Sequence, residues 1–283
     1  MRRICSCIAG CVRVRPYICP IVIVLSCVVA STTYATTFIV NNTHPLASDT
    51  NPGTSEEPLR TIRQGIVLAS TGDTVLVKAG VYLGGISLSK PIKVIGESGA
   101  TLCPLSDGQG VGVFISSDNC TIQGFRIENF SMAISAFQSP RANVKVLNNH
   151  TYKSEYSCWI DGTNWLIEGN EFERAYWWSG VGDCDYTRMF GRGHVFRGNY
   201  IHGTNIPYDI EPLFGNDYAH LDAIQYFGNS SNGEVFQDIR IERNFVTDIV
   251  QGLYISNPDN PGDINNVTIT DHVIWGQSNH PAG

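Results

Sequence analysis

One pattern of apolar and polar positions recurs along the second half of the chain. It reads apolar-x-apolar-x-x-Asn-x-apolar, and successive copies begin 24, 21, 29, 45 and 28 residues apart. Apolar and polar residues alternate on both sides of a turn residue, which predicts two short strands joined by a tight turn. The copies lie at 120–127, 144–151, 165–172, 194–201, 239–246 and 267–274.

Strands this short cannot bury an apolar face alone, but stacked coils of them share a continuous core. A coil of 21–24 residues predicts an all-β fold, a right-handed parallel β-helix. The alternative is a sandwich of antiparallel strands. It is disfavoured because hairpin dipeptides such as Asn232-Gly233 are scarce.

The repeated asparagine is predicted to occupy a tight turn. Asparagine tolerates left-handed backbone angles, and its side chain can bond to the coils above and below. The positions are Asn149, Asn170, Asn199 and Asn244, with His272 in the last copy.

The N-terminal part of the chain predicts a cap for this stack. Leu59, Ile62, Ile66 and Ala69 recur at helical spacing, so a short amphipathic helix over 59–70 is expected to cover the first coil. The chain ends at Gly283, just after the last copy of the repeat, and we interpret it as truncated at this end.

An export signal precedes the repeats. Residues 1–16 are rich in arginine, and 17–30 form an apolar run of secretory length that is followed by small residues. We therefore predict a signal peptide over 1–35, a secreted β-helix domain over 36–283, and no membrane association after cleavage. The alternative is an uncleaved N-terminal anchor.

Composition narrows the choice of partners. The chain has 19 Lys and Arg against 26 Asp and Glu; four of the arginines lie in the signal, so the remainder carries 15 against 26, a net charge of −11. This balance disfavours nucleic acid, which needs a basic surface. It is compatible with divalent cations or neutral ligands. We expect a monomer.

Four cysteines follow the signal. The sequence does not decide whether they form disulfides or are buried free thiols; they are Cys103, Cys120, Cys158 and Cys184.

The segment 38–82 resembles the N-terminal segment of secreted right-handed β-helix proteins of the pectate-lyase-like superfamily. The resemblance rests on four short motifs and, with the coils, extends over 38–283. The motifs are Ser48-Asp49-x-Asn51-Pro52-Gly53-Thr54, Pro58-Leu59-x-Thr61-Ile62, Gly72-Asp73-Thr74-Val75 and Gly80-x-Tyr82. The superfamily includes polysaccharide lyases, epimerases, hydrolases and non-catalytic surface proteins, so the fold alone does not select an activity.

The sharpest candidate motif for chemistry is His220-x-Asp222-x-x-Gln225, and a similar run occurs in this superfamily. Alignment with 252–256 predicts that Gln225 faces outward at the same level as Tyr254. His220 and Asp222 are candidates for a His–carboxylate pair that transfers protons. A structural corner that fixes the preceding loop is an equally open interpretation.

A second candidate group comprises Asp161, Asp183 and Asp185. Carboxylates gathered on one face suit Ca²⁺, or the paired acids of a glycosidase. We predict that these aspartates and the His220 motif converge on one solvent-facing groove. Neighbouring aromatic side chains favour a sugar ligand, because flat rings stack on sugar faces. The aromatic candidates are Trp159, Trp177, Trp178 and Tyr254.

A lyase of this superfamily takes the C5 proton with Lys or Arg, while Ca²⁺ or Arg neutralises the uronate. No Lys follows Lys153, so Arg188 and Arg192 are the candidate bases. The resemblance thus favours a lyase that cleaves acidic polysaccharides by β-elimination with a possible Ca²⁺ cofactor. Two alternatives are a glycoside hydrolase with paired aspartates and a β-helix that only binds glycan or acts as a spacer.

Overall fold

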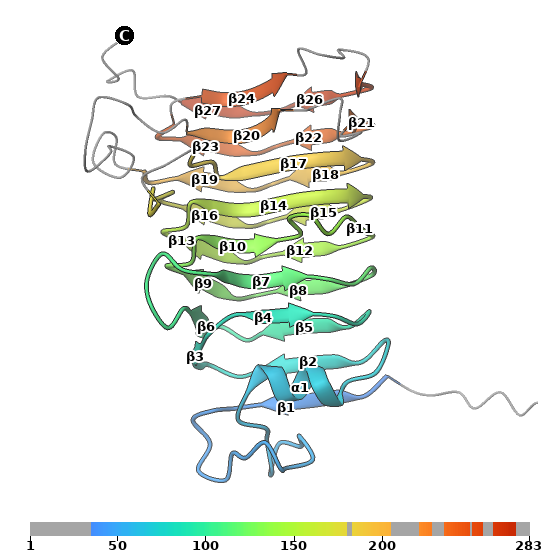
Figure 1. The fold of residues 1–283 in the computed structure, drawn as a ribbon, viewed down its shortest axis with the longest axis vertical. Coiled ribbons are helices and arrows are strands. Elements are labelled where there is room, and N and C mark those ends of the chain that lie inside the picture. Colours follow the sequence, from blue (N-terminus) through green and yellow to red (C-terminus); the bar gives the residue numbers. More distant parts are fainter. Residues whose placement is uncertain are drawn as a thin grey trace, which may run out of the picture. The chain divides into compact units, whose positions relative to one another are not determined.

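The computed structural model describes residues 35–179, 183–204, 221–227, 235–249, 251–256 and 263–275. Every strand pairing in this part of the chain is parallel, and the strands form three sheets, here called A, B and C (Figure 1). From β2 onward the strands follow one another in the order sheet A, sheet B, sheet C, while β1 adds a first strand to sheet A and the last described coil contributes only to sheets A and B. The predicted right-handed parallel β-helix is confirmed.

The strands are short, and most have three or four residues. Sheet A contains β1 (Thr37–Val40), β2 (Thr74–Val77), β5 (Lys93–Gly96), β8 (Thr121–Gln123), β12 (Lys145–Leu147), β15 (Leu166–Glu168), β18 (Val195–Arg197), β22 (Arg240–Glu242) and β26 (Thr268–Thr270). Sheet B contains β3 (Gly80–Leu83), β6 (Ala100–Cys103), β9 (Arg126–Glu128), β13 (His150–Tyr152), β16 (Glu171–Glu173), β19 (Tyr200–His202), β23 (Phe245–Thr247) and β27 (Val273–Trp275).

Sheet C has the longest strands. Its main path contains β4 (Ile86–Leu88), β7 (Val111–Ile115), β10 (Met132–Ser135), β14 (Tyr156–Thr163), β17 (Thr187–Arg192), β20 (Asp222–Phe227) and β24 (Gln251–Ser256). Three short strands extend it: β11 (Arg141–Ala142), β21 (Phe236–Gln237) and β25 (Ile264–Asn265). Two copies of the repeat, 165–172 and 194–201, pair in parallel through β15 with β18 and β16 with β19, so the antiparallel sandwich is excluded.

The core is a stack of equivalent side chains from successive coils. In sheet A the register aligns Ile122, Val146, Ile167, Phe196 and Ile241, and each of them is buried. Alternate residues of each strand point inward, so every coil adds one apolar layer to the same column. This stacking is what makes strands of three residues stable.

The repeated asparagines form a buried ladder, as predicted. The backbone N–H and the Nδ2 of Asn149 both donate to Oδ1 of Asn170, at 2.9 and 3.1 Å. Asn170 donates in the same way to Asn199, and Asn199 to Asn244. The backbone N–H of Asn244 donates to Nδ1 of His272 at 3.2 Å, which explains how histidine can end the series.

The prediction of left-handed backbone at the ladder asparagines is wrong by one residue. The residue before each ladder position has the positive φ instead, as in Asn148, at +50°. The ladder side chain points into the core, so the chain reverses one position earlier, at a residue whose side chain points outward. In the six copies of the repeat, the positive-φ residue before the ladder position is Gly124, Asn148, Gly169, Gly198, Arg243 or Asp271.

The predicted cap is present as α1 (Ile62–Leu68), which lies beside β1 and β2 (Figure 1). Its buried residues include Ile62 and Ile66. The helix begins three residues later than predicted, because Leu59 is extended and bridges to Val40. Thr61 accepts from the N–H of Gln64 as N-cap.

The C-terminal end of α1 is held by one lysine. Nζ of Lys90 donates to the carbonyls of Ile66, Val67 and Ala69 at 3.0, 2.8 and 2.7 Å. A cation at this end satisfies free carbonyls and opposes the negative end of the helix dipole. Replacement Lys90→Met should therefore lower the free energy of unfolding by about 1–2 kcal/mol, measured by urea denaturation. An unchanged midpoint would contradict this role for Lys90.

The four cysteines at 103, 120, 158 and 184 are free thiols, which decides between the two interpretations left open for them. No helix within the described residues is long and apolar enough to cross a membrane. Residues 1–34 lie outside the described part, so the signal peptide stays a prediction.

Candidate functional site

One outward-facing row of sheet C gathers several of the predicted residues. In register, Trp159 of β14 is opposite Arg188 of β17, Arg188 is opposite Gln225 of β20, and Gln225 is opposite Tyr254 of β24. Gln225 is itself only 4% exposed, and its neighbours Ala223, Ile224 and Tyr226 are buried in the core. Because parallel strands lie about 4.8 Å apart, the row extends over roughly 14 Å.

Arg188 is the centre of this row. Its Nε donates to Oδ2 of Asp185 at 2.9 Å, and its terminal nitrogen donates to Asp183. The guanidinium carbon lies 5.0 Å from the ring centre of Tyr156 and 5.1 Å from that of Trp159. The arginine is therefore clamped between two carboxylates and two aromatic rings, a geometry in which cation–π attraction adds to the ion pairs.

A third carboxylate, that of Asp222, lies beside this clamp. The backbone N–H of Asp222 donates to Oδ1 of Asp185 at 3.2 Å. Nε2 of Gln225 donates to Oδ2 of Asp222, also at 3.2 Å. Asp185 comes just before β17 and Asp222 begins β20, so the stacking of two coils brings the two carboxylates together.

Burial dominates the electrostatics of the pair. Burial raises the pKa of Asp185, Arg188 opposes the rise, and the nearby Asp222 and Asp183 add to it, so that the pKa lies at about 7. The two bonded aspartates raise the pKa of Arg188, so its guanidinium is always charged. The site therefore combines one permanent cation with a carboxyl group that titrates near neutral pH.

This raised pKa has a consequence for stability. The unfolded carboxyl has a pKa of about 3.9, so between about pH 4 and pH 7 the folded state binds more protons than the unfolded state. The contribution of Asp185 to stability is thus present at low pH and is lost as the pH rises through that window. We expect Asp185→Asn to become more stable relative to the wild type as the pH rises from about 4 to about 7, measured by urea midpoints. A difference that stays constant over this window would contradict the raised pKa.

The predicted residues do not all form an open groove. Asp183, Asp185, Arg188, Asp222 and Gln225 do converge, but Asp185 and Asp222 are both fully buried. The prediction that these two line a solvent-facing groove is wrong, because bonds to Arg188, a backbone N–H and an amide let both carboxylates be buried. Solvent reaches the cluster through Arg188 and Asp183, whose side chains are 18% and 39% exposed. His220 lies outside the described residues.

Two other predicted residues lie apart from this cluster. Arg192 is exposed at the far end of β17, opposite Thr163 and Gln237, so it does not join Arg188 as a candidate base. Asp161 is opposite Phe190 in register. The predicted calcium ligands Asp183 and Asp185 are both engaged by Arg188, so Ca²⁺ binding there stays a prediction and would have to displace the arginine.

The tryptophans divide between several roles. Trp159 is nearly buried and contacts Phe137 and Phe190, with ring centres 4.7 and 5.8 Å away. Trp177 packs against the hydrophobic core.

Trp178 is committed elsewhere. Its Nε1 donates to the carbonyl of Lys153 at 2.9 Å, and its ring lies against Gly108. Its predicted role in sugar binding is therefore not supported by its position.

Two aromatic neighbours of Arg188, Tyr156 and Phe190, were not predicted from the sequence. Tyr156 donates through its hydroxyl to the carbonyl of Asp183 at 2.8 Å, and it packs edge-on against Trp159. Phe190 continues the aromatic contacts onto β17. An alignment of the outward positions of 156–163 and 187–192 would have placed Phe190 opposite Asp161, whereas Tyr156 has the alternation of the inward residues Cys158 and Ile160 and gave no such signal.

Comparison with solved structures finds β-helix proteins at low identity. A rhamnogalacturonan lyase is 15% identical with a TM-score of 0.44; the match covers 86% of this chain but only 62% of the lyase. Pectin methylesterase PemA from Erwinia chrysanthemi is 13% identical with a TM-score of 0.44, covering 89% and 92% of the two chains. Pectate lyase Pel9A is 12% identical with a TM-score of 0.40, covering 82% and 80%. Likeness at this level carries no information on activity.

A search of curated proteins finds no match. A family model described as "Protein of unknown function (DUF1565)" matches residues 46–266. This range begins before α1 and ends just after β25. It includes the four ladder asparagines and the whole cluster around Arg188. The chain therefore belongs to the DUF1565 family.

Proposed function

We propose that this protein is a polysaccharide-active hydrolase in which Asp185 and Asp222 form the acid–base pair. The observation that carries this proposal is that Asp185, with a pKa raised to about 7, accepts the backbone N–H of a second buried aspartate, Asp222. Glycoside hydrolysis needs one carboxyl group that donates a proton and one carboxylate that acts as base or nucleophile. A carboxyl that titrates near neutral pH suits the donor.

The neighbouring residues suit a sugar substrate. Arg188 is a fixed cation that can bind a uronate carboxylate, and Tyr156, Trp159 and Tyr254 lie on or beside the same row. A row of roughly 14 Å matches about three sugar units. Asp185 and Asp222 are fully buried, so a substrate would meet Arg188 and Asp183 first, and Arg188 would have to move aside before the scissile bond reaches the pair.

β-Elimination, the leading prediction from the sequence, has weaker support. Arg188 is held by two carboxylates that raise its pKa, so it is a poor proton acceptor. The strands β14, β17, β20 and β24 contain no lysine. A lyase reaction would have to use Asp185 or Asp222 as its base.

Hydrolysis of an ester on the polysaccharide is a second candidate. Gln225 donates one hydrogen of its amide to Asp222, and its second hydrogen is suited to the oxyanion that forms when an ester is attacked. The same carboxylate pair would then provide the nucleophile or base and the acid.

The proposed setting is extracellular, with a polysaccharide as the partner and the chain acting as a monomer. The predicted signal peptide over 1–35 and the net charge of −11 beyond it agree with this setting. The charge disfavours free diffusion towards a polyanion, so a positive anchor such as Arg188 gains importance for an acidic glycan.

The test is incubation with a panel of neutral, uronate and esterified polysaccharides, with Asp222→Asn as the blank. New reducing ends without ultraviolet absorbance would support glycoside hydrolysis, and released methanol or acetate would support the esterase. Rising absorbance from unsaturated products would replace the proposal with a lyase. Glycan binding without any product would leave a binding protein.

A further inference from the structure

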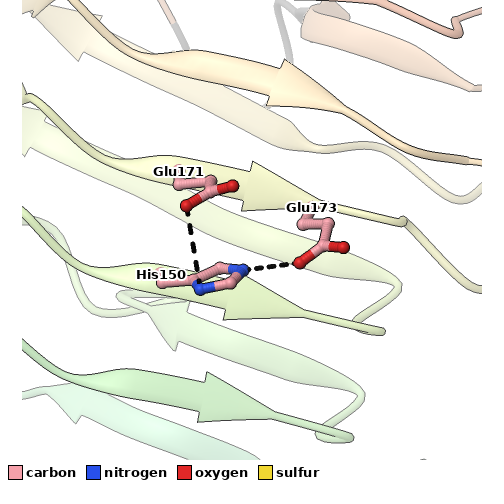
Figure 2. A group of neighbouring side chains, drawn as sticks. All are labelled: His150, Glu171 and Glu173. Atoms are coloured by element: carbon pink, nitrogen blue, oxygen red, sulfur yellow. Dashed lines mark hydrogen bonds and ion pairs between the residues drawn. The ribbon is translucent and has the colours of Figure 1, made fainter. Parts of the chain in front are cut away.

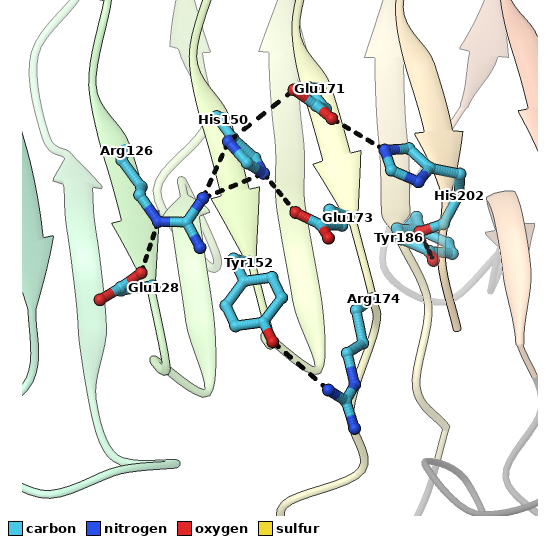
Figure 3. A network of polar contacts seen from close by, with 9 residues as sticks. All are labelled: Arg126, Glu128, His150, Tyr152, Glu171, Glu173, Arg174, Tyr186 and His202. Carbon is cyan, nitrogen blue, oxygen red and sulfur yellow. Dashed lines mark hydrogen bonds and ion pairs between the residues drawn. The ribbon is translucent and has the colours of Figure 1, made fainter. Parts of the chain in front are cut away.

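Sheet B carries a second polar cluster that the proposed hydrolase reaction does not use. It consists of His150 on β13, Glu171 and Glu173 on β16, and His202 on β19 (Figures 2 and 3). All four side chains are partly exposed, on the outward face of three successive coils. An ion from solvent can therefore reach them.

The distances within the cluster are those of a metal-ligand set. Nε2 of His150 lies 2.7 Å from Oε2 of Glu173, and Nδ1 of the same ring lies 3.8 Å from Oε2 of Glu171 (Figure 2). Three ligand atoms, one from each residue, lie within 4.8 Å of one another. Ligands bound to a tetrahedral Zn²⁺ at 2.0–2.1 Å are about 3.3 Å apart, so only small side-chain movements separate this arrangement from a bound one.

We propose that His150, Glu171 and Glu173 bind a divalent ion of the zinc class. Imidazole nitrogen combined with carboxylate oxygen favours Zn²⁺ over Ca²⁺, which takes six to eight oxygen ligands. The ion would replace the hydrogen that Nε2 of His150 shares with Glu173.

His202 acts as a positioning residue for this site. Its Nε2 bonds to Oε1 of Glu171 at 2.9 Å, which leaves Oε2 directed at His150 (Figure 3). The imidazole of His202 is itself fixed by stacking on Tyr200, with ring centres 3.8 Å apart. Carboxylate ligands of metals are commonly held by such a second hydrogen bond.

Arg126 opposes the ion. Its terminal nitrogen lies 3.0 Å from Nδ1 of His150, and its Nε is paired with Glu128 at 2.5 Å (Figure 3). The same terminal nitrogen lies 3.3 Å from Nε2, the proposed ligand atom, and a guanidinium at this distance repels a cation. Loss of its charge should therefore strengthen metal binding, an effect opposite to the loss of any ligand.

The test is isothermal titration of the purified, untagged protein with ZnCl₂, in a Cys103→Ser background. Cys103 lies near Glu128, and burial together with Glu128 raises its pKa to about 11, so the thiol is a weak ligand, but its removal excludes it. We expect one Zn²⁺ per chain. His150→Ala and Glu173→Gln should abolish binding, His202→Ala should weaken it about 10–100-fold, and Arg126→Gln should strengthen it.

Glu168→Gln is the matched control. Glu168 lies in the same coil as Glu171 and is equally exposed, but on sheet A, where it pairs with Arg197 at 2.8 Å. The Glu168→Gln variant should bind Zn²⁺ with the same affinity as the wild type. With Co²⁺ in place of Zn²⁺, visible absorption of a nitrogen–oxygen site should appear in the control and not in His150→Ala. No Zn²⁺ binding, unchanged affinity in His150→Ala and Glu173→Gln, or Ca²⁺ bound in preference to Zn²⁺ would overturn the proposal.

Discussion

Replacement of Asp185 by asparagine is expected to lower the hydrolytic rate by a factor of about 10²–10⁴, with little effect on the fold. Asparagine has nearly the same shape and can still accept the backbone N–H of Asp222, but it cannot exchange a proton. Asp222→Asn should have a comparable effect, because the pair needs both carboxyl groups. The measurement is the initial rate on the best polysaccharide of the panel.

The pH profile separates a catalytic from a structural role. If Asp185 donates the proton, the wild-type rate should fall as the pH rises through about 7, and the residual rate of Asp185→Asn should lack this limb. The control is Glu97→Gln, which removes an ion pair with Lys78 on sheet A and should leave the rate unchanged. A variant at Asp185 that keeps more than a tenth of the rate would exclude it as the acid.

The same substitution should stabilise the protein above about pH 7, because it removes a buried carboxyl that must otherwise lose its proton there. A residue whose removal raises stability and abolishes activity is expected at a functional site and not in a structural network. The opposite pair of results, lost stability with full activity, would identify the Asp185–Arg188 contact as structural.

The repeat in the sequence was sufficient to predict the architecture. Each coil presents the same alternation to its neighbours, so the register of one pair, such as Ile224 with Leu253, follows from aligning two strands. The same alignment correctly placed Gln225 opposite Tyr254. Local patterns succeed here because every contact in a solenoid is between equivalent positions of adjacent coils.

Burial of charged residues was not predictable in this way. A pattern that places Asp185 and Asp222 at the ends of strands gives no indication that a backbone N–H, an amide and Arg188 will satisfy them. Such partners come from different coils, and their side-chain directions decide whether a carboxylate is covered. The sequence therefore predicted correctly that Asp185 and Asp222 lie close together, but wrongly that they are exposed to solvent.

The cluster of His150, Glu171 and Glu173 on sheet B could have been predicted from the repeat in the sequence. His150 directly follows a ladder asparagine, and Glu171 and Glu173 occupy the first and third positions after the next one. Aligning the copies on the ladder would have placed these three side chains on one outward face.

The second prediction with a large expected effect concerns the stability that the asparagine ladder provides. Asn170→Ala should lower the free energy of unfolding by about 2–4 kcal/mol, because it leaves several buried groups without partners. The N–H and Nδ2 of Asn149 would lose their shared acceptor, and the carbonyl of Val146 would lose its donor at 2.9 Å. No water can easily replace these bonds, since Asn149, Asn170 and Asn199 are each only 1% exposed.

The matched control for this prediction is Asn164→Gly, in the same coil as Asn170 but at an exposed turn. Asn164 makes one long side-chain bond, 3.4 Å to Asn143, and its φ of +56° is well suited to glycine. Its loss should change stability by less than about 0.5 kcal/mol. Urea denaturation of both variants tests the difference. Equal midpoints for the two would mean that the buried ladder adds no more to stability than an exposed turn does, and that the apolar columns alone hold the coils together.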